Sequence, residues 1–100
     1  MGDTNCPVER AANVIGGKWT LLILRDLFSG TKRFGELRTS LTGISPKTLT
    51  ERLRALEQDG VVTRKIYPEV PPRVEYSLTT SGQTLKPIIE GMREWGERRA

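Results

Sequence analysis

The chain has 100 residues, a net charge of +4 at neutral pH, one cysteine and no histidine. This length suits one domain with a single modest core, and the composition excludes an internal disulfide framework, a histidine–cysteine metal site and a histidine-based catalytic triad. No stretch reaches the roughly 20 apolar residues needed to span a bilayer, and the N-terminus lacks the features of a signal peptide. We therefore expect a cytoplasmic protein that is not an enzyme and holds no metal or cofactor.

The positive charge is concentrated in one part of the chain. Residues 18–54 carry eight basic and three acidic side chains, whereas residues 55–100 carry seven of each. A local cationic excess favours a polyanionic partner, because neutralising phosphates releases counterions. The alternative is a solvated surface with a chance surplus of charge. The elements predicted within this region decide between the two.

The N-terminal segment is predicted to be a tail followed by a short helix. Residues 1–5 are polar and are expected to fray. A helix is predicted over residues 6–16, because Pro7 suits the first helical position and Glu9 suits the positive end of the helix dipole. Gly16-Gly17 ends this helix and allows a turn.

The second predicted helix covers residues 18–28 and is apolar around most of its circumference. Such a helix is buried on several sides, so we expect it to form the centre of the core. Trp19 is interpreted as a core residue rather than a ligand-stacking one. Residues 31–34 have room for only a very short strand before the next helix.

Residues 34–59 are predicted to form a helix-turn-helix: a short helix over 34–41, a glycine-containing turn and a longer second helix. Ser45 is a good N-cap for the second helix, and Pro46 loses nothing at the first helical position. Gly60 is placed to end it in a left-handed conformation. One apolar stripe at helical spacing consists of Leu49, Leu53 and Leu56.

The outer face of this second helix has two halves of different charge. The half from Ser45 to Arg54 is polar and basic, which suits a groove of nucleic acid. The half from Ala55 onward contains Glu57 and Asp59 and is expected to point away from phosphate.

The pattern becomes extended after Gly60, and residues 61–78 are predicted to form a β-hairpin. Its strands cover residues 61–67 and 73–78, and the segment between them contains three prolines that cannot continue a strand. Val74, Tyr76 and Leu78 are predicted to share one face of the second strand. A hairpin directly after a helix of the recognition type is a wing.

A last helix is predicted over residues 80–98, capped by Thr79 or Thr80 and kinked at Pro87, which removes an interior hydrogen bond. Its apolar face, from Leu85 to Trp95, needs a partner, and the candidates are the first helix and a second subunit.

These stretches together resemble the HxlR-type winged helix-turn-helix transcriptional regulators. The resemblance covers about residues 6–96 and is carried by several motifs. They are Cys6-Pro7-Val8-Glu9, Ile15-Gly16-Gly17-Lys18-Trp19 with the helix that follows, Arg33-Phe34-Gly35-Glu36-Leu37, Gly43-Ile44-Ser45 with Leu49 to Arg54, Tyr67 to Leu78, and Ser77 to Gly82. The resemblance implies one α+β domain over residues 1–100, mainly α, with extra terminal helices over 6–16 and 80–98. It implies a homodimer joined through those helices and a pseudo-palindromic double-stranded DNA operator.

The expected DNA contacts come from the helix-turn-helix and the wing. Lys47, Thr48, Glu51 and Arg52 are expected nearest to base edges or phosphates, with Thr50 beside them, and Ser45 nearest to a phosphate at the helix end. Further contacts, mainly to the DNA backbone, are expected from Lys32, Arg33, Arg54, Arg64, Lys65 and Arg73. The alternative for each basic residue is an ordinary solvated surface charge.

Cys6 has two interpretations. A helix N-terminus favours the reactive thiolate, and some proteins of the resembled family sense oxidants, quinones or aldehydes through such a cysteine. The alternative is a plain capping residue. For the whole chain, the competing function is a winged-helix module that binds protein without binding DNA, and the basic excess argues against it.

Overall fold

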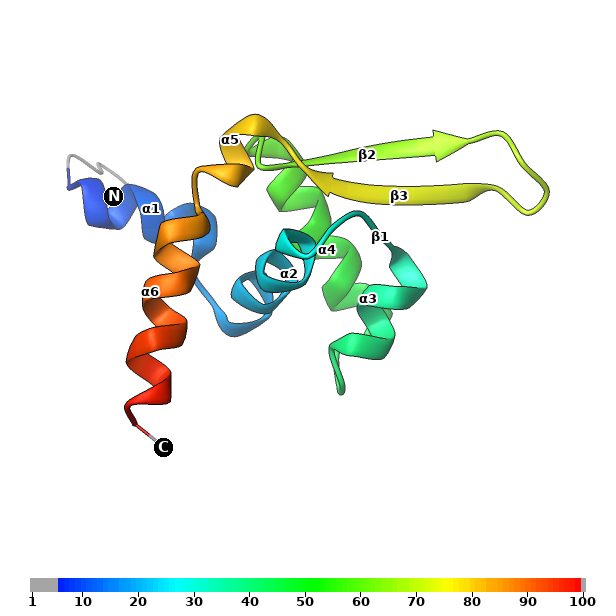
Figure 1. Ribbon diagram of the computed structural model, residues 1–100. Helices are drawn as coiled ribbons and strands as arrows, with labels where there is room; N and C mark the ends of the chain where they lie inside the picture. The colour runs from blue at the N-terminus through cyan, green and yellow to red at the C-terminus, as the bar shows by residue number, and fades with distance from the viewer. Residues whose placement is uncertain (1–5, 100) are drawn as a thin grey trace.

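The computed structural model describes residues 6–99 (Figure 1). The elements in chain order are α1 (Pro7–Ile15), α2 (Lys18–Phe28), β1 (Lys32–Arg33), α3 (Phe34–Ser40), α4 (Pro46–Gln58), β2 (Val62–Tyr67), β3 (Arg73–Leu78), α5 (Thr80–Gln83) and α6 (Lys86–Glu97). The predicted fold class, a mainly helical winged helix-turn-helix, is confirmed. The fraying expected of residues 1–5 lies outside the described residues.

The boundaries of α4 follow from its local sequence. The backbone N–H of Thr48 donates to Ser45 Oγ at 3.0 Å, so Ser45 caps the helix as predicted. Pro46 occupies the first turn, where its missing N–H removes no helical hydrogen bond. Gly60 follows the helix with a φ of +74°, a backbone conformation that residues other than glycine rarely adopt.

The core forms where α2 meets the helix-turn-helix. Seven side chains are essentially fully buried, and they come from α2, from α3 and the turn after it, and from α4. They are Ile23, Leu24, Leu37, Leu41, Leu49, Leu53 and Leu56. The predicted stripe of α4 therefore faces inward, and its other side is left for solvent or a ligand. Trp19 packs against this core while remaining partly exposed.

The sheet is antiparallel with the strand order β1-β3-β2. The β2–β3 hairpin is the wing, and it projects away from the helices in Figure 1. Its register pairs Val62 with Leu78 at the base and Tyr67 with Arg73 near the tip. Paired residues of antiparallel strands share a face, so Arg64 and its partner Tyr76 lie on one face of the hairpin and Lys65 on the other.

The prediction of one kinked C-terminal helix is wrong, because the structure has two helices there. Thr79 caps the short α5, and its hydroxyl also donates to the Gly60 carbonyl oxygen at 2.6 Å. A side chain at Gly82 would collide with the carbonyl oxygen of Val61, so α5 packs directly on the backbone that follows α4. Pro87 lies in the first turn of α6, where it removes no interior hydrogen bond and produces no kink.

The terminal helices lie together on the side of the molecule opposite to the wing tip (Figure 1). Large apolar side chains on this side remain exposed within the described chain. They are Val8 on α1 and Ile88, Met92 and Trp95 on α6. Ile89 of α6, in contrast, is buried against the core.

Candidate DNA-binding interface

The first half of α4 presents a polar and basic surface. Since Leu49, Leu53 and Leu56 are buried, the remaining side chains of the helix face outward or sideways. Of the residues predicted here to contact DNA, five are exposed and two are half-buried. The exposed ones are Ser45, Lys47, Glu51, Arg52 and Arg54, and the half-buried ones are Thr48 and Thr50. This surface also contains the first turn of α4, at the positive end of the helix dipole. Pro46 has no N–H and the Thr48 N–H donates to Ser45 Oγ, so the backbone N–H of Lys47 is the one left for a ligand in this turn.

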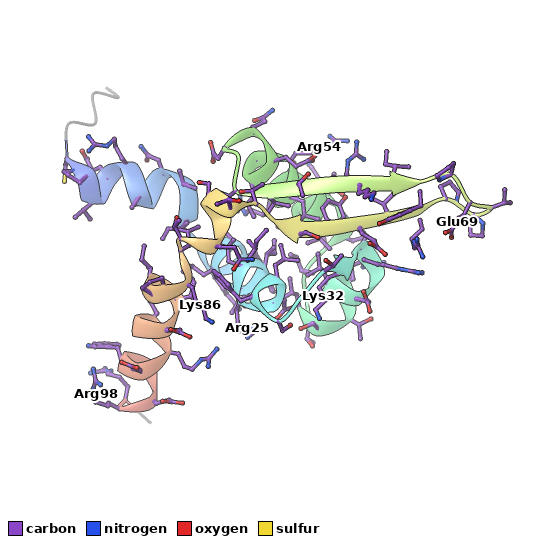
Figure 2. The ribbon with its side chains drawn as sticks, turned by 45° about the horizontal axis from the view of Figure 1, so that its top comes forward. Arg25, Lys32, Arg54, Glu69, Lys86 and Arg98 are labelled. Atoms are coloured by element: carbon purple, nitrogen blue, oxygen red, sulfur yellow. The ribbon has the colours of Figure 1, made fainter. Side chains whose placement is uncertain are left out.

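A cavity of about 270 Å³ lies where α4 meets the base of the wing. Its lining combines hydroxyl, cationic and acidic groups with one leucine. The lining residues are Thr50, Leu53, Arg54, Glu57, Arg64 and Tyr76. The fold thus brings together three predicted contact residues from two elements: Thr50 and Arg54 from α4, and Arg64 from β2. In Figure 2 Arg54 lies beside the base of the hairpin, while Glu69 is at its tip.

Glu57 faces the wing. From the sequence it is expected to point away from phosphate, and in the structure its Oε2 lies 3.8 Å from Nε of Arg64, a predicted DNA contact. The reason is helical geometry: Glu57 follows Arg54 by three residues and so lies on the same side of α4. The sequence does not show that β2 packs beside this side of α4, and it is this packing that brings Glu57 next to Arg64.

Tyr76 lines this cavity and is buried. Burial raises the pKa of its hydroxyl, while the positive charge of Arg64 and a hydrogen bond from Arg64 act in the opposite direction. The phenol therefore remains protonated at neutral pH. It lies opposite Arg64 in the lining of the cavity and retains a proton that it can donate.

The other basic residues of the wing have their own surroundings. Lys65 Nζ lies 4.9 Å and the Arg73 guanidinium carbon 4.0 Å from the centre of the Tyr67 ring. Arg73 also forms ion pairs with Glu69 at 3.3 Å and Glu75 at 3.4 Å. The structure therefore does not gather the three predicted wing contacts into one group, and it gives Arg73 intramolecular partners.

Lys32 and Arg33 form β1, at the edge of the sheet beside β3. Arg33 is exposed, and its backbone N–H donates to the Glu36 carboxylate at 2.7 Å, which fixes the start of α3. Arg33 also lines a cavity of about 380 Å³ between the start of α3 and the hairpin tip. Both residues thus lie beside the wing, on the strand paired with β3.

Cys6 is the N-cap residue of α1, and its thiol is free and exposed. Its side chain makes no capping hydrogen bond to the helix. In Figure 1, α1 is at the far end of the molecule from the wing tip. Any effect of Cys6 chemistry on DNA binding would therefore have to act through the terminal helices.

Residues 14–100 match the family described as HxlR-like helix-turn-helix. The chain belongs to this family. It is a DNA-binding transcriptional regulator of the HxlR type with a winged-helix fold. The resemblance stated from its motifs is therefore confirmed.

Individual relatives agree with this assignment. The chain is 50% identical over 93 residues to the HTH-type transcriptional regulator YdeP of Bacillus subtilis, covering 93% of this chain and 73% of that protein. The solved structure of the redox regulator HypR in its oxidized form is 50% identical, with a TM-score of 0.89 over 93% of this chain and 96% of that one. The reduced form of the regulator YodB from B. subtilis is 39% identical, with a TM-score of 0.81 over 93% and 92% of the two chains.

Sequence reasoning did not place Glu57 and Tyr76 in the cavity that this HxlR-like regulator has between α4 and the base of the wing. The spacing of Glu57 from Arg54 is a signal that could have placed the two on one helix side. Tyr76 gave no comparable signal, because its neighbours come from the packing of the hairpin on α4.

Within residues 6–99, no helix is long and apolar enough to cross a bilayer.

Proposed function

We propose that this regulator binds a pseudo-palindromic operator as a homodimer, with α4 of each subunit in the major groove of one half-site. The observation that carries this proposal is the outward, polar and basic first half of α4, supported from behind by its buried leucines. A helix of a dimeric helix-turn-helix protein reads half-sites about one turn of DNA apart.

Each side chain has a role in this proposal. Lys47 and Arg52 suit the acceptors of guanine, Glu51 suits the amino group of cytosine, and the Thr48 methyl group suits thymine. Ser45 and the backbone N–H of Lys47 hold a phosphate at the start of the helix. Other phosphates are held by Lys32, Arg33, Thr50, Arg54, Arg64 and Lys65. Arg73 was predicted to join them, but its ion pairs and its contact with Tyr67 favour a structural role in the wing.

The proposed dimer is joined through α1 and α6. Val8, Ile88, Met92 and Trp95 leave apolar surface exposed on these helices, and pairing two copies would bury it. The two reading helices would then have a fixed separation. In this proposal the protein acts in the cytoplasm and catalyses no reaction.

The test is selection of bound fragments from genomic DNA by the purified protein, followed by gel shifts on the enriched sites. We expect an enriched inverted repeat whose half-sites are about 10 base pairs apart, bound by two copies of the chain. Recovery of fragments without any shared sequence would contradict sequence-specific reading. An absence of DNA binding would favour the alternative, a winged-helix module that binds protein.

We further propose that Cys6 makes the regulator responsive to oxidants or to reactive electrophiles such as quinones and aldehydes. Support comes from the exposed free thiol at the start of α1 and from the likeness to the redox regulator HypR. Because α1 belongs to the proposed dimer interface, modification of Cys6 would change how the two subunits are arranged. Two Cys6 thiols from different subunits could also be oxidised to one disulfide.

A further inference from the structure

Several polar and charged side chains meet where α4 packs against the base of the wing. Arg54, Arg64, Thr50 and Tyr76 provide two cations and two hydroxyl groups around one cavity of about 270 Å³. Cations and hydroxyl donors are the groups that proteins use to hold phosphate oxygens. Glu57 is the single acidic group in the lining of this cavity, and it faces Arg64.

We propose that this cavity binds one DNA backbone phosphate. In the free protein the Glu57 carboxylate takes the position of that phosphate and pairs with Arg64. The proposal rests on the DNA-binding function above and adds a residue that limits affinity. When DNA binds, the phosphate replaces the Glu57 carboxylate as the partner of Arg64. Glu57 then lies beside the phosphate as a like charge.

The geometry of the ion pair supports such an exchange. The distance from Arg64 Nε to Glu57 Oε2 is long, at 3.8 Å, and the side chains of Arg64 and Glu57 are 45% and 32% exposed. Exposed, loosely paired charges of this kind contribute little to stability, so the pair can be opened at small cost. Arg64 stays beside the cavity when the pair opens, because it comes from a strand that is paired along its length, directly opposite the buried Tyr76.

The proposal predicts an unusual sign for a substitution in a DNA-binding site. Glu57→Gln preserves the size of the side chain and removes its charge. We expect it to tighten binding about three- to five-fold on operator and on unrelated DNA alike, since one like-charge interaction near water is removed. The slope of log K against log salt should steepen by at most about 0.9, the release of one further counterion.

Three controls make this test specific. Glu94→Gln removes the same charge from α6, away from the junction, and should change affinity much less. Arg64→Gln should weaken binding. Adding Glu57→Gln to it should bring a smaller gain than in the unmodified protein, because the competition for Arg64 is then absent and only the like-charge repulsion of the phosphate is removed. Thermal midpoints check folding, and size-exclusion chromatography checks the oligomeric state of each variant.

Two results would overturn the proposal: Glu57→Gln binding more weakly than the unmodified protein, or a gain no larger than that of Glu94→Gln. Weaker binding by Glu57→Gln would mean that the ion pair of Glu57 with Arg64 holds the wing in the position that DNA binding needs. NMR of the arginine Nε–H groups in the unmodified protein gives a measurement without variants. Both Arg54 and Arg64 signals should shift on titration with a short duplex, and a static Arg64 signal would contradict the exchange. Failure of the unmodified protein to bind any duplex would instead contradict the proposed function.

Discussion

The guanidinium carbon of Arg73 lies 4.0 Å from the centre of the Tyr67 ring, across the last pair of residues in the wing. The same guanidinium contacts Glu69 and Glu75, so it joins the two strands and the start of the turn. A planar guanidinium can stack on a ring and pair with carboxylates at once, whereas an ammonium group cannot reproduce this arrangement.

Arg73→Lys should therefore loosen the wing although it keeps the charge. We expect faster amide hydrogen exchange in the outer halves of β2 and β3, with little change in the exchange of α2 and α4. Arg33→Lys, a matched change on the neighbouring strand, should leave the wing amides unaffected. Equal exchange of the wing in the unmodified protein and Arg73→Lys would show that these contacts do not hold it.

Lys47→Ala should weaken operator binding by about 1–3 kcal/mol if the side chain contacts a base, and should relax the preference for one base pair. Its thermal midpoint should stay nearly unchanged, because Lys47 is exposed. Fluorescence anisotropy with systematically altered operators measures both quantities. Lys86→Ala, which removes the same charge from the start of α6, is the control.

Leu53→Ala should destabilise the fold by about 2–5 kcal/mol, because it leaves a cavity in the packed centre of α4. The Leu53 side chain is only 1% exposed. Urea denaturation measures the loss, and Arg52→Ala on the exposed side of the same helix should change stability by no more than about 0.5 kcal/mol. A cost for Leu53→Ala near that of Arg52→Ala would contradict the described packing.

Tyr76 predicts a pH dependence of stability. Burial raises the pKa of its hydroxyl in the folded protein above the ordinary value of 10.0. The unfolded chain therefore releases this proton at a lower pH than the folded chain. The stability that the neutral phenol contributes is complete below pH 10 and is lost as the pH rises through the folded-state pKa.

Urea midpoints of the unmodified protein and Tyr76→Phe, measured from pH 8 to 11.5, test this dependence. The unmodified protein should lose more stability above pH 10 than the variant does. Parallel curves for the two proteins would show that ionisation of Tyr76 is not linked to unfolding.

Diamide treatment tests the proposed role of Cys6. The unmodified protein should form a dimer that survives denaturation without reductant, and its operator affinity should change. Cys6→Ser should remain monomeric on the same gel and should keep its affinity. If neither protein responds to diamide or to a quinone, Cys6 is only a residue at the start of α1.

Much of the fold follows from local sequence signals. The ends of α2 and the capping of α4 were predicted correctly, because capping groups, glycines and apolar spacing act within a few residues. The C-terminal region was predicted wrongly for the opposite reason. The pattern around Pro87 is compatible with a kinked helix, and the sequence does not show that Gly82 of α5 packs against the backbone of Val61, a residue distant along the chain.

The sequence by itself determined which helix could read DNA: a capped α4 with its leucines on one side and its basic residues on the other. Only the tertiary structure decided which charges meet. The strand register places Arg64 beside Tyr76 and toward α4, and a shift of one residue would have placed Lys65 there instead. Contacts such as that between Glu57 and Arg64 arise because packing, and not spacing along the chain, sets the distance between side chains of different elements.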